Sequence, residues 1–282
     1  MSVSSRKPSK LSDVYQRLSK KLSKAVVDYL DAPDEDRTHD LRVAIRRFRM
    51  LARQLPKKER GKELQRYLNM CEKFLTLSTD LRDLDVIRDR LGRYRENEAV
   101  PAMLRDLSRK RRKLVKGSIK TARRLRASRL PRRAFWNTSE VWSQLKGSLA
   151  EFDVDLPRRL SFVLRSEKNV KALHQLKKEV RKYRYLLELL PQTEGRTKAC
   201  DSLRQLQDKL GEIRDSDVVI DYLASAGSSR EVRKLSQAQK EFRSARYADL
   251  VSTSSKGMGN GGQSVLEVAG LRLRVAPAIK AA

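Results

Sequence analysis

The stretch HDLRVAIRRFRML, residues 39–51, returns 135 positions later as HQLKKEVRKYRYL, residues 174–186. A second match joins LRDLDVIRDRL at 81–91 to IRDSDVVIDYL at 213–223, 132 positions later. Unrelated helices can share an apolar period, but they would not readily share a histidine, basic residues and an Arg-Asp-x-Asp-Val run in the same order. The chain is therefore interpreted as two halves built on one plan.

Apolar residues recur at three- and four-residue spacing along most of the chain, which predicts a succession of amphipathic α-helices. The helices are expected at 11–31, from the acidic turn at 34–36 to 55, and at 60–96, 101–127, 138–164, 167–190, 195–225 and 229–250. Asp31 and Ser166, also 135 positions apart, are expected as helix N-caps. The predicted fold class is all-α, with a four-helix half at 11–127 and another at 138–250.

The C-terminal part, residues 252–282, has a different composition. Residues 252–264 are rich in Ser and Gly, which predicts a flexible linker followed by a short tail. The alternating LRLRV at 271–275 is compatible with a strand or with a docking segment, and the pattern does not choose between them.

Charge is the strongest compositional signal. Lys and Arg number 64 against 35 Asp and Glu, which gives a formal net charge of +29. A folded protein that carries such self-repulsion usually binds something anionic. Aromatic residues are only 6% of the chain, which argues against a surface built for base stacking.

Several other classes of protein are not expected. Cys71 and Cys200 form no metal-binding spacing and no disulfide framework, which favours a reducing compartment. Because no run of about 18 apolar residues occurs, a membrane partner is not expected. The N-terminal residues lack the apolar stretch of a signal peptide. We expect a cytoplasmic protein.

Basic residues gather on one face of each repeated helix, within an arc of about 80° at 100° per residue. We call these faces the first and second basic stripes: His39, Arg42, Arg46, Arg49 and Arg53, and then His174, Lys177, Arg181 and Arg184. Cations about one helical turn apart suit a polyanion with closely repeated phosphates. An ordinary solvated face is the alternative, but each stripe lacks interleaved acids and the stripe occurs twice.

The two histidines of the chain, His39 and His174, occupy matching positions. A hydrogen bond to phosphate is the preferred role, and a structural role within the stripe and metal ligation are the alternatives. No Cys or carboxylate recurs beside them at ligand spacing, so no metal is expected.

The repeated Arg-Asp-x-Asp motif does not predict a pair of catalytic carboxylates. Residues i and i+2 of a helix point about 200° apart, so its two aspartates cannot share one site. We expect one Asp of each motif to accept a hydrogen bond from an arginine of the stripe, and Arg82 and Arg214 to add to the anion site.

A further group of cations lies on the helix after Pro101. Residues 105–133 contain fourteen Lys or Arg and one acid, Asp106. The face within about 100° includes Arg109, Arg112, Lys113, Lys116 and Lys120. The matching helix of the second half keeps Arg230, Arg233 and Lys234 but loses the later cations. The anion is therefore expected to favour the first half.

Four segments together resemble the CHAD family, the conserved histidine α-helical domain. They are THDLRVAIRRFRML, LRDLDVIRDRL, ALHQLKKEVRKYRYLLELL and LGEIRDSDVVIDYL, and the resemblance covers about residues 11–250. It implies two four-helix bundles related by an internal duplication and a pseudo-twofold axis, with a basic channel or groove between them that binds inorganic polyphosphate. By position, the channel would be lined by His39, Arg42, Arg46, Arg49, His174, Lys177, Arg181 and Arg184. Lys177 departs from its counterpart Arg42 but should still bind phosphate.

The function expected from these observations is non-enzymatic binding of inorganic polyphosphate. We expect no catalytic residue and no cofactor, because hydrolysis would need a carboxylate cluster for Mg²⁺ or a base near the phosphate. Nonspecific binding of RNA or DNA through the same basic surface is the alternative. The sequence does not identify a protein partner. Polyphosphate granules are one place where a protein with this function could gather.

Overall fold

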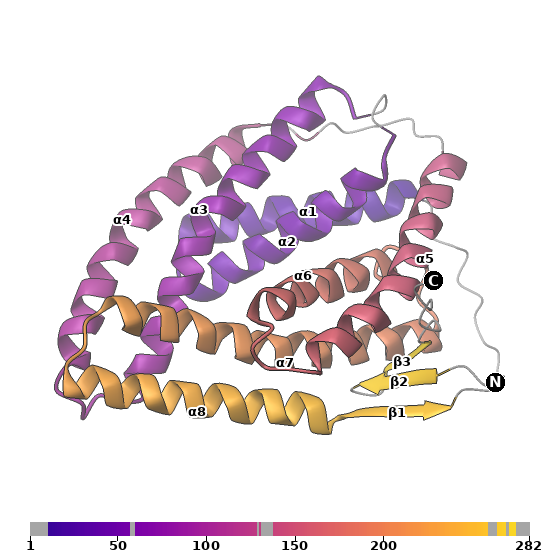
Figure 1. The fold of residues 1–282 in the computed structure, drawn as a ribbon. Coiled ribbons are helices and arrows are strands. Elements are labelled where there is room, and N and C mark those ends of the chain that lie inside the picture. The colour runs from indigo at the N-terminus through magenta and orange to yellow at the C-terminus, as the bar shows by residue number, and fades with distance from the viewer. Residues whose placement is uncertain are drawn as a thin grey trace, which may run out of the picture. The chain divides into compact units, whose positions relative to one another are not determined.

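The computed structural model describes residues 11–56, 60–128, 130, 138–258, 264–268 and 271–274. Over these residues the chain forms eight helices followed by three short strands (Figure 1). The predicted all-α class is confirmed, with a small sheet added at the C-terminal end. The chain separates into two compact units, residues 1–144 and 145–282, and each is described by itself.

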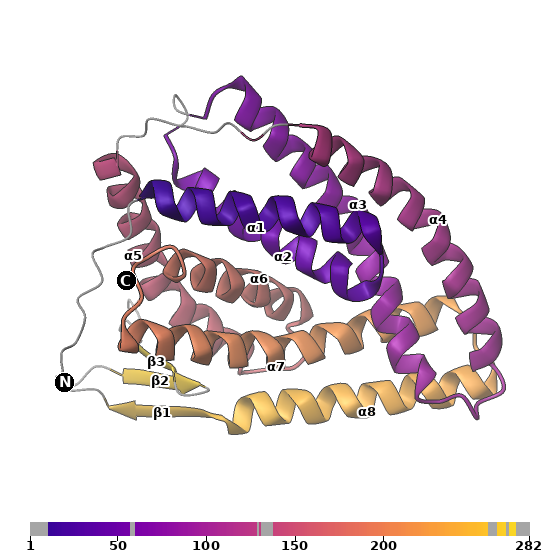
Figure 2. The same ribbon diagram turned by 180° about the vertical axis from the view of Figure 1, so that it is seen from behind.

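The helices of the first unit pack around an aromatic core. Helices α1 and α4 lie side by side, as do α1 and α2, α2 and α3, and α3 and α4 (Figures 1 and 2). Tyr29 is fully buried with its ring edge-on to Phe74, and its hydroxyl lies 2.5 Å from Ser118 Oγ on α4. The bounds are α1 Leu11–Asp31, α2 Glu35–Gln54, α3 Lys62–Gly92 and α4 Val100–Ala127.

The N-cap of α2 is Asp34, whose Oδ1 accepts the N–H of Arg37 at 2.7 Å. The prediction of Asp31 was wrong, because Asp31 is still the last residue of α1. Pro33 disfavours helical backbone at the residue before it, so the next helix is capped only after the proline. The N-cap of the matching helix is likewise Asn169 and not Ser166. Each observed N-cap therefore lies three residues after the predicted one, so the two N-caps are still 135 positions apart.

In the second unit, the structure places α6 against α7 and α7 against α8. Leu176, Val180, Leu206 and Ile213 are buried in its core, together with residues of α5 such as Leu160. The bounds are α5 Thr138–Val163, which begins before the boundary of the unit, α6 Val170–Leu187, α7 Glu194–Ser225 and α8 Arg230–Ser252.

The chain after α8 is more ordered than a flexible linker. Strands β1 Ser254–Met258, β2 Ser264–Val268 and β3 Leu271–Arg274 pair antiparallel in that order. Residues 254–258, expected as part of the linker, are a strand because the β-prone SVLEV segment at 264–268 offers a partner for their backbone groups. The LRLR segment forms the edge strand β3, and residues 259–263 lie outside the described part. None of the helices described is long and apolar enough to cross a membrane.

Candidate anion-binding site

Helix α2 presents the first stripe beside its buried apolar face. Leu41, Ile45 and Phe48 are fully buried, whereas His39 and Arg53 are exposed and Arg46 is half-buried. The stripe predicted from the helical period therefore emerges at the surface, but its members differ in exposure.

Arg42, predicted as a phosphate ligand, is buried at 7% exposure. Its Nη1 donates to the carbonyl oxygen of Leu75 at 3.1 Å and to Ser78 Oγ at 2.6 Å, both on α3. In this structure the side chain thus holds α2 against α3. Helical angle alone could not reveal this, because the helical period does not say which neighbouring helix packs beside Arg42.

His39 lies among cations. Partial burial of the ring is the largest influence that lowers its pKa, and the positive charges of Arg82, Arg46 and Arg42 lower it further against the opposing effect of Asp40. Arg82, on α3, is itself paired with Glu35 at the start of α2. The free protein therefore disfavours the imidazolium form, and an anion placed here would reverse that balance.

The second stripe, on α6, contains one buried and two half-buried cations besides its histidine. The Lys177 ammonium lies 3.8 Å from Asp215. Arg184 is buried, donates to Glu188 Oε1 at 2.9 Å and to Gln207 Oε1 at 3.3 Å, and stacks over Tyr185. Its hydrogen bonds, like those of Arg42, go to the protein.

Arg181 differs from its neighbours. Burial lowers the pKa of its guanidinium, and the adjacent Arg184 adds to that effect while Tyr185 opposes it. Within the described residues it makes no hydrogen bond or ion pair. A desolvated cation without a counter-charge costs free energy, which a bound anion would recover.

His174 takes part in a buried network instead of standing free. Its Nε2 lies 2.6 Å from Asp217 Oδ2, and Arg243 Nε on α8 donates to Asp217 Oδ1 at 2.5 Å. Burial alone would raise the pKa of Asp217, but the hydrogen bonds and charges of these two partners outweigh it and lower that pKa. This geometry favours the structural alternative for His174 over a free phosphate donor.

The first unit contains the matching ion pair without the histidine. Arg111 Nε on α4 donates to Asp85 Oδ1 at 2.6 Å, and Asp85 Oδ2 is buried with no hydrogen-bond partner in the described structure. For Asp85 and Asp217 the donor is an arginine of the helix that follows, whereas Asp215, the other aspartate of its motif, lies 3.8 Å from Lys177 of the second stripe. Sequence reasoning missed Arg111 and Arg243, although each lies 26 positions after its aspartate, a spacing that could have revealed them.

The remaining predicted cations lie at the surface. Arg109 pairs with Asp106 at 2.6 Å, whereas Arg112, Lys113, Lys116 and Lys120 are exposed along α4. Arg230 and Arg233 are exposed near the start of α8, where Lys234 pairs with Glu231 at 3.1 Å, and Arg214 is half-buried on α7. The exposed members of this set form no enclosed site and can add only screened attraction.

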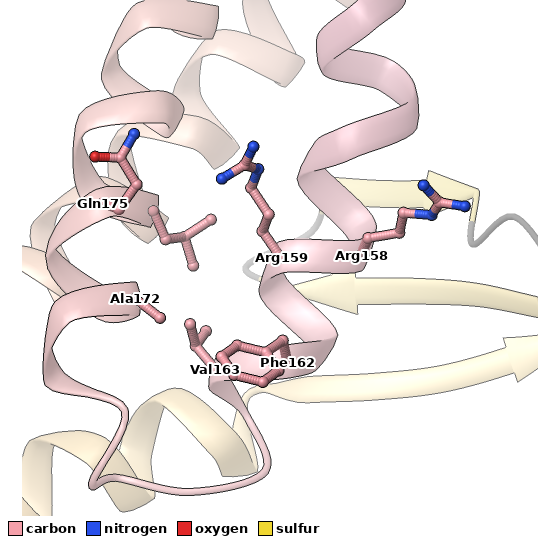
Figure 3. Close-up of a pocket in the computed structure, with 7 residues that line it drawn as sticks. Arg158, Arg159, Phe162, Val163, Ala172 and Gln175 are labelled. Atoms are coloured by element: carbon pink, nitrogen blue, oxygen red, sulfur yellow. The ribbon is translucent and has the colours of Figure 1, made fainter. Parts of the chain in front are cut away.

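Between α5 and α6 lies a cavity of about 300 Å³ that the sequence did not predict (Figure 3). Val163, Phe162 and Ala172 lie at one end of it, and Arg158 and Arg159 also belong to its lining. Arg159 is paired with Glu179 at 3.1 Å. Four of its seven lining residues are apolar, and Arg159, one of the two cations in the lining, is already paired with an acid.

The described residues contain no group of three or more His, Cys, Asp or Glu side chains that could hold a metal ion. Asp217, the carboxylate that contacts His174, is also bound by Arg243.

This geometry defines a class of helical protein in which two helices of similar sequence each carry a basic face. The CHAD domain model matches residues 15–224 and 163–255, and the chain belongs to the CHAD family. A solved structure described as the crystal structure of the CHAD domain from the plant Ricinus communis is similar in fold, with a TM-score of 0.59 and 13% identity over 89% of this chain and 90% of that one. No curated protein matches.

Proposed function

We propose that this protein binds inorganic polyphosphate, without turning it over, along the exposed parts of the two basic stripes. The observation that carries the proposal is Arg181, a half-buried guanidinium without a described acidic partner in a chain of net charge +29. Its counterpart in the repeat, Arg46, occupies the same face of α2. Both positions would gain from an anion that follows the helix surface.

Polyphosphate suits the stripes better than a nucleic acid does. A phosphate chain is thin and carries a charge on every unit, so it can follow cations spaced one helical turn, about 5 Å, apart. Single-stranded nucleic acids are usually held by aromatic stacking as well, and the stripes offer little of it. The central channel that the resemblance implies involves both units and stays a prediction.

Buried members of the stripes have a supporting part in this proposal. Arg42 and Arg184 position α2 and α6 through bonds to neighbouring residues, and the contacts to phosphate are assigned to Arg46, Arg53, Lys177 and Arg181. No catalytic role is assigned, because the described residues contain no cluster of carboxylates that could hold Mg²⁺, and Asp215 and Asp217 are paired with cations.

The proposal is tested by competition between polyphosphate and duplex DNA of matched total charge at about 150 mM salt, where nonspecific binding is weakened by counterions. Polyphosphate should displace DNA and resist displacement by it. If DNA competes equally at every salt concentration, the protein is a general polyanion binder and nucleic acid becomes the better assignment.

Charge reversal separates the stripe from bulk charge. Arg46→Glu combined with Arg181→Glu should weaken polyphosphate binding strongly, because both are assigned to direct contact. The control pair, Arg47→Glu with Lys182→Glu, lies about 100° away on the same helices and changes the net charge equally. Equal losses for the two pairs would mean a diffuse electrostatic effect and no defined site.

A further inference from the structure

A second, smaller pocket lies where the end of α2 meets the start of α3. Its volume is about 210 Å³, below the roughly 300–1,000 Å³ of pockets that take drug-sized ligands, so it suits one small group. It is lined by Arg49, Arg53, Arg60, Gln65, Leu68, Asn69 and Glu72.

Three guanidinium groups meet one carboxylate in this pocket. Arg60 is held in place, because its Nε donates to Leu55 O and its Nη2 to Arg53 O, both at 2.9 Å. Burial lowers the pKa of Arg49, and the charge of Arg53 lowers it further. Within the described residues the Arg53 side chain has no acidic or hydrogen-bonding partner. The pocket therefore holds cations that repel one another.

Glu72 offsets only part of that charge. Its carboxylate pairs with Arg49, but the side chain is 58% exposed, so it can move away when another anion enters. Beside it, Gln65 Nε2 donates to Asn69 Oδ1 at 2.9 Å, which leaves the amide N–H groups of Asn69 as donors. The net positive charge of the pocket favours an anion that carries more than one negative charge.

The second unit does not repeat this balance. At the matching positions Glu188 replaces Arg53, Asp201 replaces Asn69 and Arg204 replaces Glu72. Arg184, the counterpart of Arg49, is paired with Glu188 at 2.9 Å, and Arg204 is paired with Asp201 at 2.8 Å. These internal ion pairs neutralise the place in the second unit that corresponds to the pocket. Of these two places, the one in the first unit keeps an excess of positive charge among its described side chains.

We propose that this pocket binds the terminal phosphate group of a polyphosphate chain, an inference that rests on the proposed function. A terminal phosphate carries a second ionisable oxygen with a pKa of about 6 in phosphate monoesters, so near neutral pH it approaches a dianion, unlike a phosphate inside the chain. Three cations against one movable carboxylate match that charge. Arg49 and Arg53 also belong to the first stripe, so a chain that follows the stripe reaches the pocket at its end.

The test uses pyrophosphate, which is little more than two chain ends, as the probe in calorimetric titrations. Arg53→Gln should weaken pyrophosphate binding about tenfold, as loss of a charged hydrogen bond would. Glu72→Gln should strengthen it severalfold, because the competing carboxylate is removed. Arg66→Gln, which changes an exposed arginine of α3 that does not line the pocket, is the matched control and should change it little. The gain expected for Glu72→Gln cannot come from misfolding, so its absence would overturn the assignment.

Two further ligands distinguish the binding of chain ends from the binding of free phosphate. Arg53→Gln should weaken the binding of chains with free ends more than the binding of long polyphosphate whose ends are blocked as alkyl phosphoramidates. Arg53 contacts both kinds of chain through the stripe, but only a free end enters the pocket. If blocked and free chains behave alike, end recognition is wrong while the proposed function stands. If neither chain binds, the proposed function fails, and the pyrophosphate titrations alone decide the pocket. Orthophosphate that binds as tightly as pyrophosphate, with equal dependence on Arg53, would assign the pocket to free phosphate and overturn the inference.

Discussion

His174 Nε2 lies 2.6 Å from Asp217 Oδ2. The corresponding oxygen of the first unit, Asp85 Oδ2, is buried with no hydrogen-bond partner in the described structure, and His39 is exposed. Two histidines that occupy equivalent places in the sequence therefore have different surroundings. One stabilises a buried carboxylate, and the other remains available at the surface.

We expect His174→Ala to lower the free energy of unfolding by about 1–2 kcal/mol, because it leaves one oxygen of the buried Asp217 without its partner. His39→Ala should change stability by less than about 0.5 kcal/mol, as exposed positions usually do. Urea unfolding of both variants measures the difference. Equal effects would show that the Asp217 hydrogen bond does not stabilise the protein.

Stability should fall in acid through Asp217. Its pKa is lower in the folded protein than the ~3.9 of an unfolded chain, so its contribution is present above about pH 4 and is lost as the pH falls towards the folded value. Asp217→Asn should be less stable than the wild type at pH 7 and should lose less stability between pH 5 and 3. Thermal unfolding across that range provides the measurement, and parallel curves would contradict the prediction.

Polyphosphate binding should strengthen as the pH falls from about 8 to 6. The pKa of His39 is below its usual value in the free protein, because of burial and then the charges of Arg82, Arg46 and Arg42, with Asp40 opposing them. A bound polyanion offsets those charges and raises the pKa, so protonation and binding favour each other. His39→Gln should flatten the pH dependence while the remaining cations keep most of the affinity.

Removal of divalent metal should not weaken binding. The described residues provide no cluster of ligands for a metal ion, and the contacts assigned to phosphate are made by Arg and Lys. Polyphosphate titrated in EDTA should therefore bind at least as well as in untreated buffer. Loss of binding in EDTA that Zn²⁺ restores would instead make the histidines metal ligands.

Much of the fold could be predicted from local pattern. The apolar period placed α1 at the observed residues and α4 within one residue of them, because each helix buries one face and the spacing of that face is written in the chain. The N-caps expected from the 135-residue offset, Asp31 and Ser166, were wrong for α2 and α6. An N-cap depends on which backbone N–H a side chain reaches, and several nearby polar residues could serve.

Sequence by itself determined which residues are charged and which helix face carries them, and it predicted that the two halves repeat. Tertiary structure decided what each cation does. Arg42 and Arg184 are buried against α3 and α7, Arg181 is desolvated without a described partner, and Arg53 faces a small pocket with Arg49 and Arg60. The helical period specifies an angle around one helix, whereas desolvation and pairing depend on the neighbouring helix, and that neighbour is known only once the chain has folded.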